Sequence, residues 1–134
     1  MERSDICGCI MRLYFYADAT KVMHYTTESI HQHKLCDEVR ETILDFTDDL
    51  AEKMFGIIGK PALEDFAPEY QFERLTTIDE VCDKCLYLAD GIREAIESDN
   101  VYSGIVSLID DFKGKISQEK FLATFDRHVN FQIN

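Results

Sequence analysis

The sequence has no run in which polar and apolar residues alternate over several positions, the pattern of a half-buried strand. It also lacks internal repeats and low-complexity tracts, which excludes solenoid and linker-rich architectures. Only two prolines occur among 134 residues, Pro61 and Pro68, and both fall in one segment. The periodicity that remains is helical. It predicts an all-α protein of four helices, with residues 1–134 forming a single domain.

Positive charge is scarce, with 14 Lys and Arg against 26 Asp and Glu, a formal charge of −12 and a pI of about 4.6. Nucleic acids and anionic membranes bind basic patches, so we expect neither as a direct partner. No stretch of about 18 apolar residues is present, which predicts no membrane span. The first ten residues lack the basic and apolar regions of a secretory signal. The expected location is cytoplasmic.

The five cysteines are an odd number and include the pair Cys82 and Cys85 at CxxC spacing. No second pair stands at the spacing of a zinc site, and no strand pattern precedes this one. Free cysteines behave as small buried hydrophobic residues. We therefore expect unpaired thiols packed in the core.

Apolar periodicity and capping signals, with Ser4 as the first cap, place four helices at 4–24, about 29–58, 77–98 and 101–127. The apolar face expected of the third helix consists of Ile78, Val81, Cys82, Cys85, Leu88, Ala89, Ile92 and Ile96, and that of the fourth includes Phe121. Ser29 with Gln32, and Thr77 with Glu80, each match a capping box. The connection over 59–76 is long for adjacent antiparallel helices, and it can cross the end of a bundle or run along its length. Gly104 and Gly114 lower helix propensity and leave open a break near Gly114.

The first helix carries apolar residues on more than one side. Ile6, Ile10, Leu13 and Ala17 follow helical spacing, and aromatic residues lie on other sides of the same helix. A helix that is apolar on several sides is buried by more than its own bundle. This pattern indicates self-association.

The second helix carries a stripe of nitrogen and oxygen donors. With His33 set at 0° and about 100° per residue, Asp37 falls near 40°, Asp48 near 60° and Glu52 near 100°. The apolar residues of this helix cluster instead at roughly 200–300°. They are Leu35, Val39, Ile43, Phe46, Leu50, Met54 and Ile57.

A metal centre inside a four-helix bundle has its ligands on the stripe that faces the core. Here the donors face away from it, so a second copy of the chain would have to complete the site. Carboxylates and imidazoles suit Fe(II), Mn(II) or Zn(II). Taken alone, the stripe also fits an ordinary solvated helix face, since acidic residues are abundant.

Two other histidines lie near the stripe. His24 ends the first helix and must be separated from His33 by a break, because on one continuous helix the two would lie on opposite sides. His24 is either a ligand or a cap for helix carbonyls. His31 lies near 160°, off the stripe. Glu28 and His31 have the Glu-x2-His spacing of in-bundle di-iron proteins, but no second such motif is present.

The spacing His33-x3-Asp37-x10-Asp48-x3-Glu52 resembles the ferroxidase site of the Dps-type mini-ferritins. In that family a His-Trp pair ends the first helix, and His24-Tyr25 stands at the similar position here. The residues after the stripe, from Ala51 to Pro61, are similar to the end of that family's second helix. The resemblance covers about residues 24–61. In length, and in its short His24-to-His33 segment, the chain is still more similar to small ferritin-like proteins of phage and viral genomes.

The resemblance implies a ferritin-like antiparallel four-helix bundle with a long crossover between helices two and three. It implies an iron site shared by two subunits, with His24, His33, Asp37, Asp48 and Glu52 as ligands, zinc or manganese being alternative metals. The implied function is Fe(II) oxidation by oxygen or peroxide, followed by iron sequestration. The implied assembly is a homo-oligomer, from a dimer to a twelve-subunit cage.

The chain departs from the Dps pattern in four ways, one of which is the absence of that family's Gly-containing loop. The His24-to-His33 segment is about three residues shorter, Tyr25 replaces Trp, and no basic N-terminal arm is present. The alternative expectation is therefore a non-enzymatic oligomeric module whose metal site is structural or vestigial.

Overall fold

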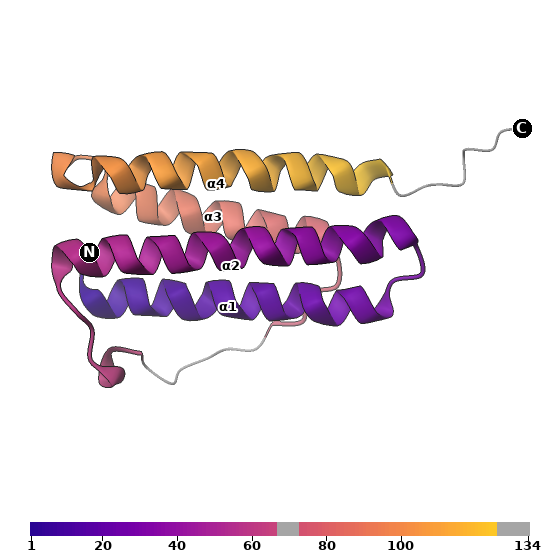
Figure 1. Ribbon diagram of the computed structural model, residues 1–134, viewed down its shortest axis with the longest axis horizontal. Coiled ribbons are helices and arrows are strands. Elements are labelled where there is room, and N and C mark those ends of the chain that lie inside the picture. Colours follow the sequence, from indigo (N-terminus) through magenta and orange to yellow (C-terminus); the bar gives the residue numbers. More distant parts are fainter. Residues whose placement is uncertain (67–72, 126–134) are drawn as a thin grey trace, which may run out of the picture.

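The computed structural model describes residues 1–66 and 73–125, and in those ranges the regular structure is entirely helical (Figure 1). The four α-helices are α1 (Arg3–Thr26), α2 (Ile30–Ile58), α3 (Ile78–Ile96) and α4 (Ser103–Leu122). The three short 3-10 helices are η1 (Leu63–Asp65), η2 (Asn100–Tyr102) and η3 (Ala123–Phe125). The described residues contain no strand, which confirms the predicted all-α class.

The four helices lie side by side along one long axis (Figure 1). α1 and α2 form an antiparallel pair, since Arg3 at the start of α1 reaches the carbonyl of Ile58 at the end of α2. α4 runs antiparallel to α2, because Thr42 contacts Glu119 whereas Phe46 stacks on Phe112. α3 and α4 are also antiparallel. α2 and α3 therefore run in the same direction, and α2 ends at the opposite end of the bundle from the start of α3 (Figure 1).

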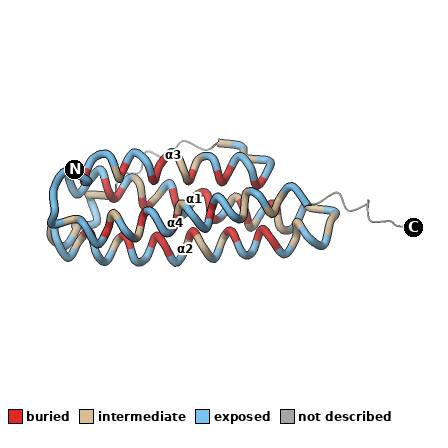
Figure 2. Tube along the Cα trace, turned by 90° about the horizontal axis from the view of Figure 1, so that it is seen from above, coloured by how far each residue is buried: buried red, intermediate tan, exposed pale blue. Residues whose placement is uncertain are grey.

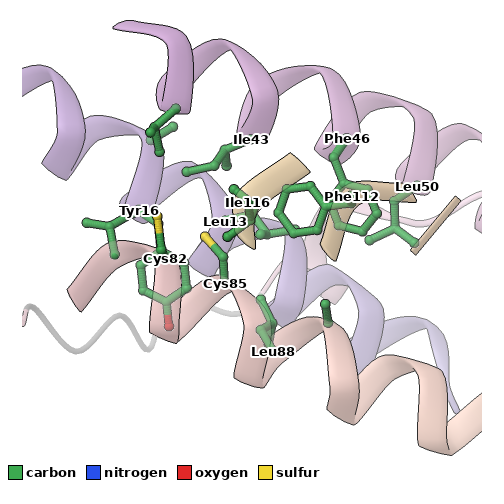
Figure 3. Close-up of a cluster of buried hydrophobic side chains, with 14 of the residues drawn as sticks. Leu13, Tyr16, Ile43, Phe46, Leu50, Cys82, Cys85, Leu88, Phe112 and Ile116 are labelled. Carbon is green, nitrogen blue, oxygen red and sulfur yellow. The ribbon is translucent and has the colours of Figure 1, made fainter. Parts of the chain in front are cut away.

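The core is one continuous cluster of buried side chains from all four helices (Figures 2 and 3). The rings of Phe46 and Phe112 stack near its centre, with centroids 3.8 Å apart and planes 9° from parallel. The predicted apolar face of α3 is buried at every position: Ile78, Val81, Cys82, Cys85, Leu88, Ala89, Ile92 and Ile96. The helical periodicity of the sequence therefore predicts correctly which side of α3 is buried.

Some residues assigned to the apolar faces from spacing are exposed instead. Ile57 lies in the last turn of α2 and keeps 39% of its surface exposed, and Phe121 near the end of α4 keeps 60%. Both extend past the region where all four helices overlap, so helical spacing alone does not bury them. The break near Gly114 that the sequence left open is absent. α4 passes through this residue without interruption, since the buried Phe112 and Ile116 anchor the helix on either side.

The helix starts match most of the predicted capping signals. The Ser29 hydroxyl accepts a hydrogen bond from the Gln32 amide, and Thr77 and Glu80 form a complete capping box. α1 begins at Arg3, and its capping box is formed by Glu2 and Asp5 rather than by the predicted Ser4 cap. These bonds satisfy backbone N–H groups that have no partner inside the helix.

The residues between α2 and α3 are described only in part. Leu63 of η1 is exposed, whereas Phe66 is half-buried and packs against the core. Pro68 lies outside the described residues, as do the last two residues predicted for the fourth helix. None of the helices in the described part of the chain combines the length and apolarity needed to cross a membrane.

All five cysteines are free, which confirms the prediction of unpaired thiols. Cys82 and Cys85 are fully buried beside Tyr16 and Leu88 (Figure 3). Burial raises the pKa of the Cys82 thiol to about 12. A thiol held in its protonated form is a poor nucleophile and metal ligand, so this pair packs the core.

Candidate metal centre

His24 and His33 meet at the turn between α1 and α2. α1 ends at Thr26 and α2 begins at Ile30, so a three-residue connection reverses the chain between the two histidines. Their rings stack with centroids 3.6 Å apart and planes 26° from parallel. The predicted break between the histidines is confirmed, and it brings them together from two different helices.

Each ring is held by the other residue's backbone. Nδ1 of His24 lies 2.8 Å from the carbonyl oxygen of His33, and Nδ1 of His33 lies 2.8 Å from the carbonyl oxygen of His24. A carbonyl oxygen only accepts, so we assign the ring proton to Nδ1 in both residues. In the neutral form Nε2 then carries a lone pair. Metal-binding histidines are held in this way, with one ring nitrogen donating to a backbone carbonyl.

Asp37 lies one turn after His33 on α2, and its carboxylate contacts the ring of His24. Its Oδ1 is 3.3 Å from Nδ1 of His24 and 3.1 Å from Nζ of Lys21. The Lys21 hydrogen bond holds the pKa of the Asp37 carboxyl below its ordinary value. His24 is 12% exposed and Asp37 is 48% exposed. The histidine is thus enclosed, whereas the carboxylate stands at the surface with one oxygen already in use.

Asp48 and Glu52 form the other part of the stripe. They are one turn apart on α2, and both are exposed. A hydrogen bond with Asp48 raises the pKa of the Glu52 carboxyl, and the Asp48 charge adds to the effect. Two neighbouring carboxylates repel each other, and a bound cation would relieve that repulsion.

The structure does not bring all five predicted ligands together within one chain. His33 and Asp48 are fifteen residues apart on one straight helix, which corresponds to about 22 Å. Among residues 1–66 and 73–125, no group of three or more His, Cys, Asp or Glu side chains is placed to hold a metal ion. The donors instead form two separate sets on one side of α2, His24 with His33 and Asp37, and Asp48 with Glu52.

The other candidate histidine has a structural role. His31 donates from Nε2 to the Leu122 carbonyl at 2.8 Å, and Gln32 donates to the Ala123 carbonyl at 3.2 Å. Both side chains satisfy carbonyls at the end of α4, which an α-helix leaves unpaired. His31 therefore ties the start of α2 to the end of α4.

Sequence reasoning missed Lys21. Its ammonium bonds Asp37 and lies 5.5 Å from the centre of the Tyr25 ring, which in turn contacts His24 edge-on. Helical spacing puts Lys21 three residues before His24 on the same side of α1, a signal that could have pointed to it. Tyr25 is 73% exposed. An aromatic surface thus adjoins the enclosed histidines.

Comparison with protein families, with curated proteins and with solved structures finds no match for this chain. The resemblance to Dps-type proteins therefore rests on the residues between 24 and 61.

Proposed function

We propose that this chain is a ferritin-like, Dps-like protein that binds Fe(II) between two copies of itself and oxidises it. The observation that carries the proposal is the stacked pair of His24 and His33. Each Nδ1 hydrogen is used by a backbone carbonyl, which leaves each Nε2 free for a metal. The parallel course of α2 and α3, joined by one long connection, is consistent with a ferritin-like crossover.

The separation of the two donor sets favours a shared site. A second copy that lies antiparallel on α2, related by a two-fold axis between Arg40 and Leu44, would set His33 of one chain opposite Asp48 and Glu52 of the other. Leu44 is half-buried and lies on the stripe between the two donor sets. The exposed aromatic Tyr25 beside the histidines is a surface that such a copy would cover.

The histidines, the Asp48–Glu52 pair and Asp37 would contribute to iron binding in different ways. The histidines supply neutral nitrogen donors, and the Asp48–Glu52 pair supplies two neighbouring carboxylates whose mutual repulsion a cation would relieve. Asp37 has one oxygen engaged by Lys21 and His24, so only its second oxygen is available to bridge. Fe(II) is the substrate here. Oxygen or peroxide accepts its electron, and carboxylates stabilise the Fe(III) product.

The test is aerobic Fe(II) oxidation, followed by Fe(III) absorbance, with two pairs of variants. We expect His33→Ala and Asp48→Asn to abolish the accelerated oxidation, because each removes a donor. Asp49→Asn and His31→Ala are the matched controls, since both residues lie off the stripe, and each should keep the wild-type rate. Equal rates in all four variants and wild type would remove the proposal.

A mixing experiment tests whether the site is shared. Chains carrying His33→Ala and chains carrying Asp48→Asn are each inactive, but a mixed dimer contains one intact site. Refolding the two together should restore about a quarter of the wild-type activity, because half of randomly formed dimers are mixed. Recovery of no activity, with wild type active, would show that all donors come from one chain.

The alternative function is a non-enzymatic oligomeric module with a structural or vestigial metal site. The Lys21–Asp37 ion pair favours it, since it fills with a cationic side chain the place that a metal would take. Titration calorimetry with Fe(II) and with Zn(II) separates the two. Tight binding of either metal that is lost in His33→Ala, without oxidation, supports the structural site. Absence of binding supports the vestigial one.

A further inference from the structure

A hollow of about 870 Å³ lies between α2 and α4, beside the donor stripe of α2, and none of the five proposed iron ligands lines it. Four acids of α2 line it, Glu38, Glu41, Asp45 and Asp49. Three acids of α4 line it as well, Asp110, Asp111 and Glu119, and Lys115 is the one basic residue among the lining side chains. Leu108, Leu122 and the stacked rings of Phe46 and Phe112 supply its apolar part.

Six of these seven acids make no ion pair within the described chain; only Asp110 does, with Arg93 of α3. The α2 acids are spaced by three, four and four residues, so they form one stripe about 16 Å long. Like charges at this spacing on a helix repel one another. The hollow therefore holds a row of negative charge that the fold itself does not neutralise.

Glu119 adds a second, independent observation. Its Oε2 accepts a hydrogen bond from the Thr42 hydroxyl at 2.8 Å, but its Oε1 is fully buried and has no hydrogen-bond partner among the described residues. Burial raises the pKa of this carboxyl to about 7. A buried oxygen without a donor is costly. The α4 wall of the hollow therefore includes a carboxyl that the described residues satisfy only through Thr42.

We propose that the hollow between α2 and α4 docks a basic, amphipathic segment of another protein. Its lysines or arginines would follow the acidic stripe, and its apolar side chains would lie on Leu108 and Leu122. A single divalent ion fits less well, since no three of the donors in the described residues converge on one point. A second copy of this acidic chain, or a nucleic acid, would add negative charge to negative charge.

The test measures binding of a fluorescein-labelled helical peptide of leucines and regularly spaced lysines, by fluorescence anisotropy at about 0.15 M salt, where long-range attraction is screened. The groove variant carries Glu41→Gln, Asp45→Asn and Asp49→Asn. The control variant carries Asp18→Asn, Glu64→Gln and Glu94→Gln, which change the net charge equally outside the hollow. A peptide with glutamates in place of the lysines reports non-specific binding.

We expect the wild type and the control variant to bind the lysine peptide with affinities within about twofold. The groove variant should bind about tenfold more weakly, because three charge contacts are lost. Equal loss in both variants would overturn the proposal, since net charge alone would explain it. So would absence of wild-type binding, or a stoichiometric Mg²⁺ or Ca²⁺ site that displaces the peptide. Circular dichroism confirms that both variants are folded.

Discussion

α4 packs against two neighbours, and the two seams are built differently. On the α3 side, three ion pairs bridge the helices, Arg93–Asp110 at 2.8 Å, Lys113–Asp90 at 2.5 Å and Lys120–Asp83 at 2.6 Å. On the α2 side no ion pair joins the two helices in the described chain. The hydrogen bonds on this side are those of His31 and Gln32 to carbonyls at the end of α4 and that of Thr42 to Glu119.

The comparison shows that surface charge does not decide which helices pack together in this bundle. The α2–α4 seam stays closed beneath a row of like charges because the Phe46 and Phe112 rings stack below it. Exposed ion pairs contribute little, whereas burying an aromatic ring contributes several times more. The charges are therefore free to serve binding, and the apolar contacts below them maintain the fold.

Replacing Phe112 by alanine should have the largest effect, and it tests whether the stacked rings rather than the surface charges hold α2 and α4 together. Phe112 is 3% exposed, so Phe112→Ala removes a buried ring and leaves a cavity under the acidic row. We expect the free energy of unfolding to fall by about 3–5 kcal/mol, measured by urea denaturation. Phe121→Ala is the control, since this ring is exposed at the end of α4. Similar losses in both variants would mean that the stack does not close the seam.

The buried faces were predictable because helix spacing determines which side chains face inward wherever all four helices overlap. The apolar faces of α1 and α3 follow directly from the sequence. Ile57 and Phe121 were assigned wrongly because spacing does not say where the overlap stops. Continuity through Gly114 was not predictable either, because tertiary packing of Phe112 and Ile116 outweighs the local propensity of one glycine.

Glu119, on the α2 side of α4, should make the free energy of unfolding depend on pH. Its folded-state pKa is about 7, raised by burial from the ordinary value of 4.5. The protonated form is thus favoured in the folded state, and the stability it contributes is complete below the ordinary pKa and lost as pH rises through about 7. Since the group is only half-buried, we expect the wild type to lose about 1 kcal/mol between pH 5 and 8.

The variant Glu119→Gln keeps an acceptor for Thr42 but does not ionise. Its unfolding free energy should therefore stay level over this pH range, and it should exceed that of the wild type at pH 8. Glu94→Gln, on the exposed side of α3, should retain the wild-type slope. If Glu119→Gln keeps that slope too, the pH dependence originates at another group.

The candidate metal site was predictable only as a stripe. Spacing on one helix puts His33, Asp37, Asp48 and Glu52 on one side, and all four lie within the single helix α2. It does not indicate the stacking of the two imidazoles or the carbonyls that hold them, because these depend on the path of the three-residue turn. Nor does it indicate that Lys21 occupies an oxygen of Asp37, since that contact joins two helices.

The smallest effect comes from two neighbouring acids of the hollow, of which only Asp110 also forms an ion pair with α3 in the described chain. The hydrogen bond from Arg93 holds the pKa of the Asp110 carboxyl below its ordinary value, whereas Asp111 lines the acidic hollow without an ion pair in the described chain. Asp110→Asn removes a favourable interaction and should lower the melting temperature slightly. Asp111→Asn removes a repulsive charge and should leave it unchanged or raise it.

Differential scanning calorimetry of the two variants at low and at high salt distinguishes these cases. The loss in Asp110→Asn should shrink as salt increases, because salt screens the ion pair that the wild type retains. Any gain in Asp111→Asn should shrink for the same reason, since salt also screens repulsion. If both substitutions lowered the melting temperature alike, the acids of the hollow would be neutralised within the fold, and the difference between the two seams of α4 would not exist.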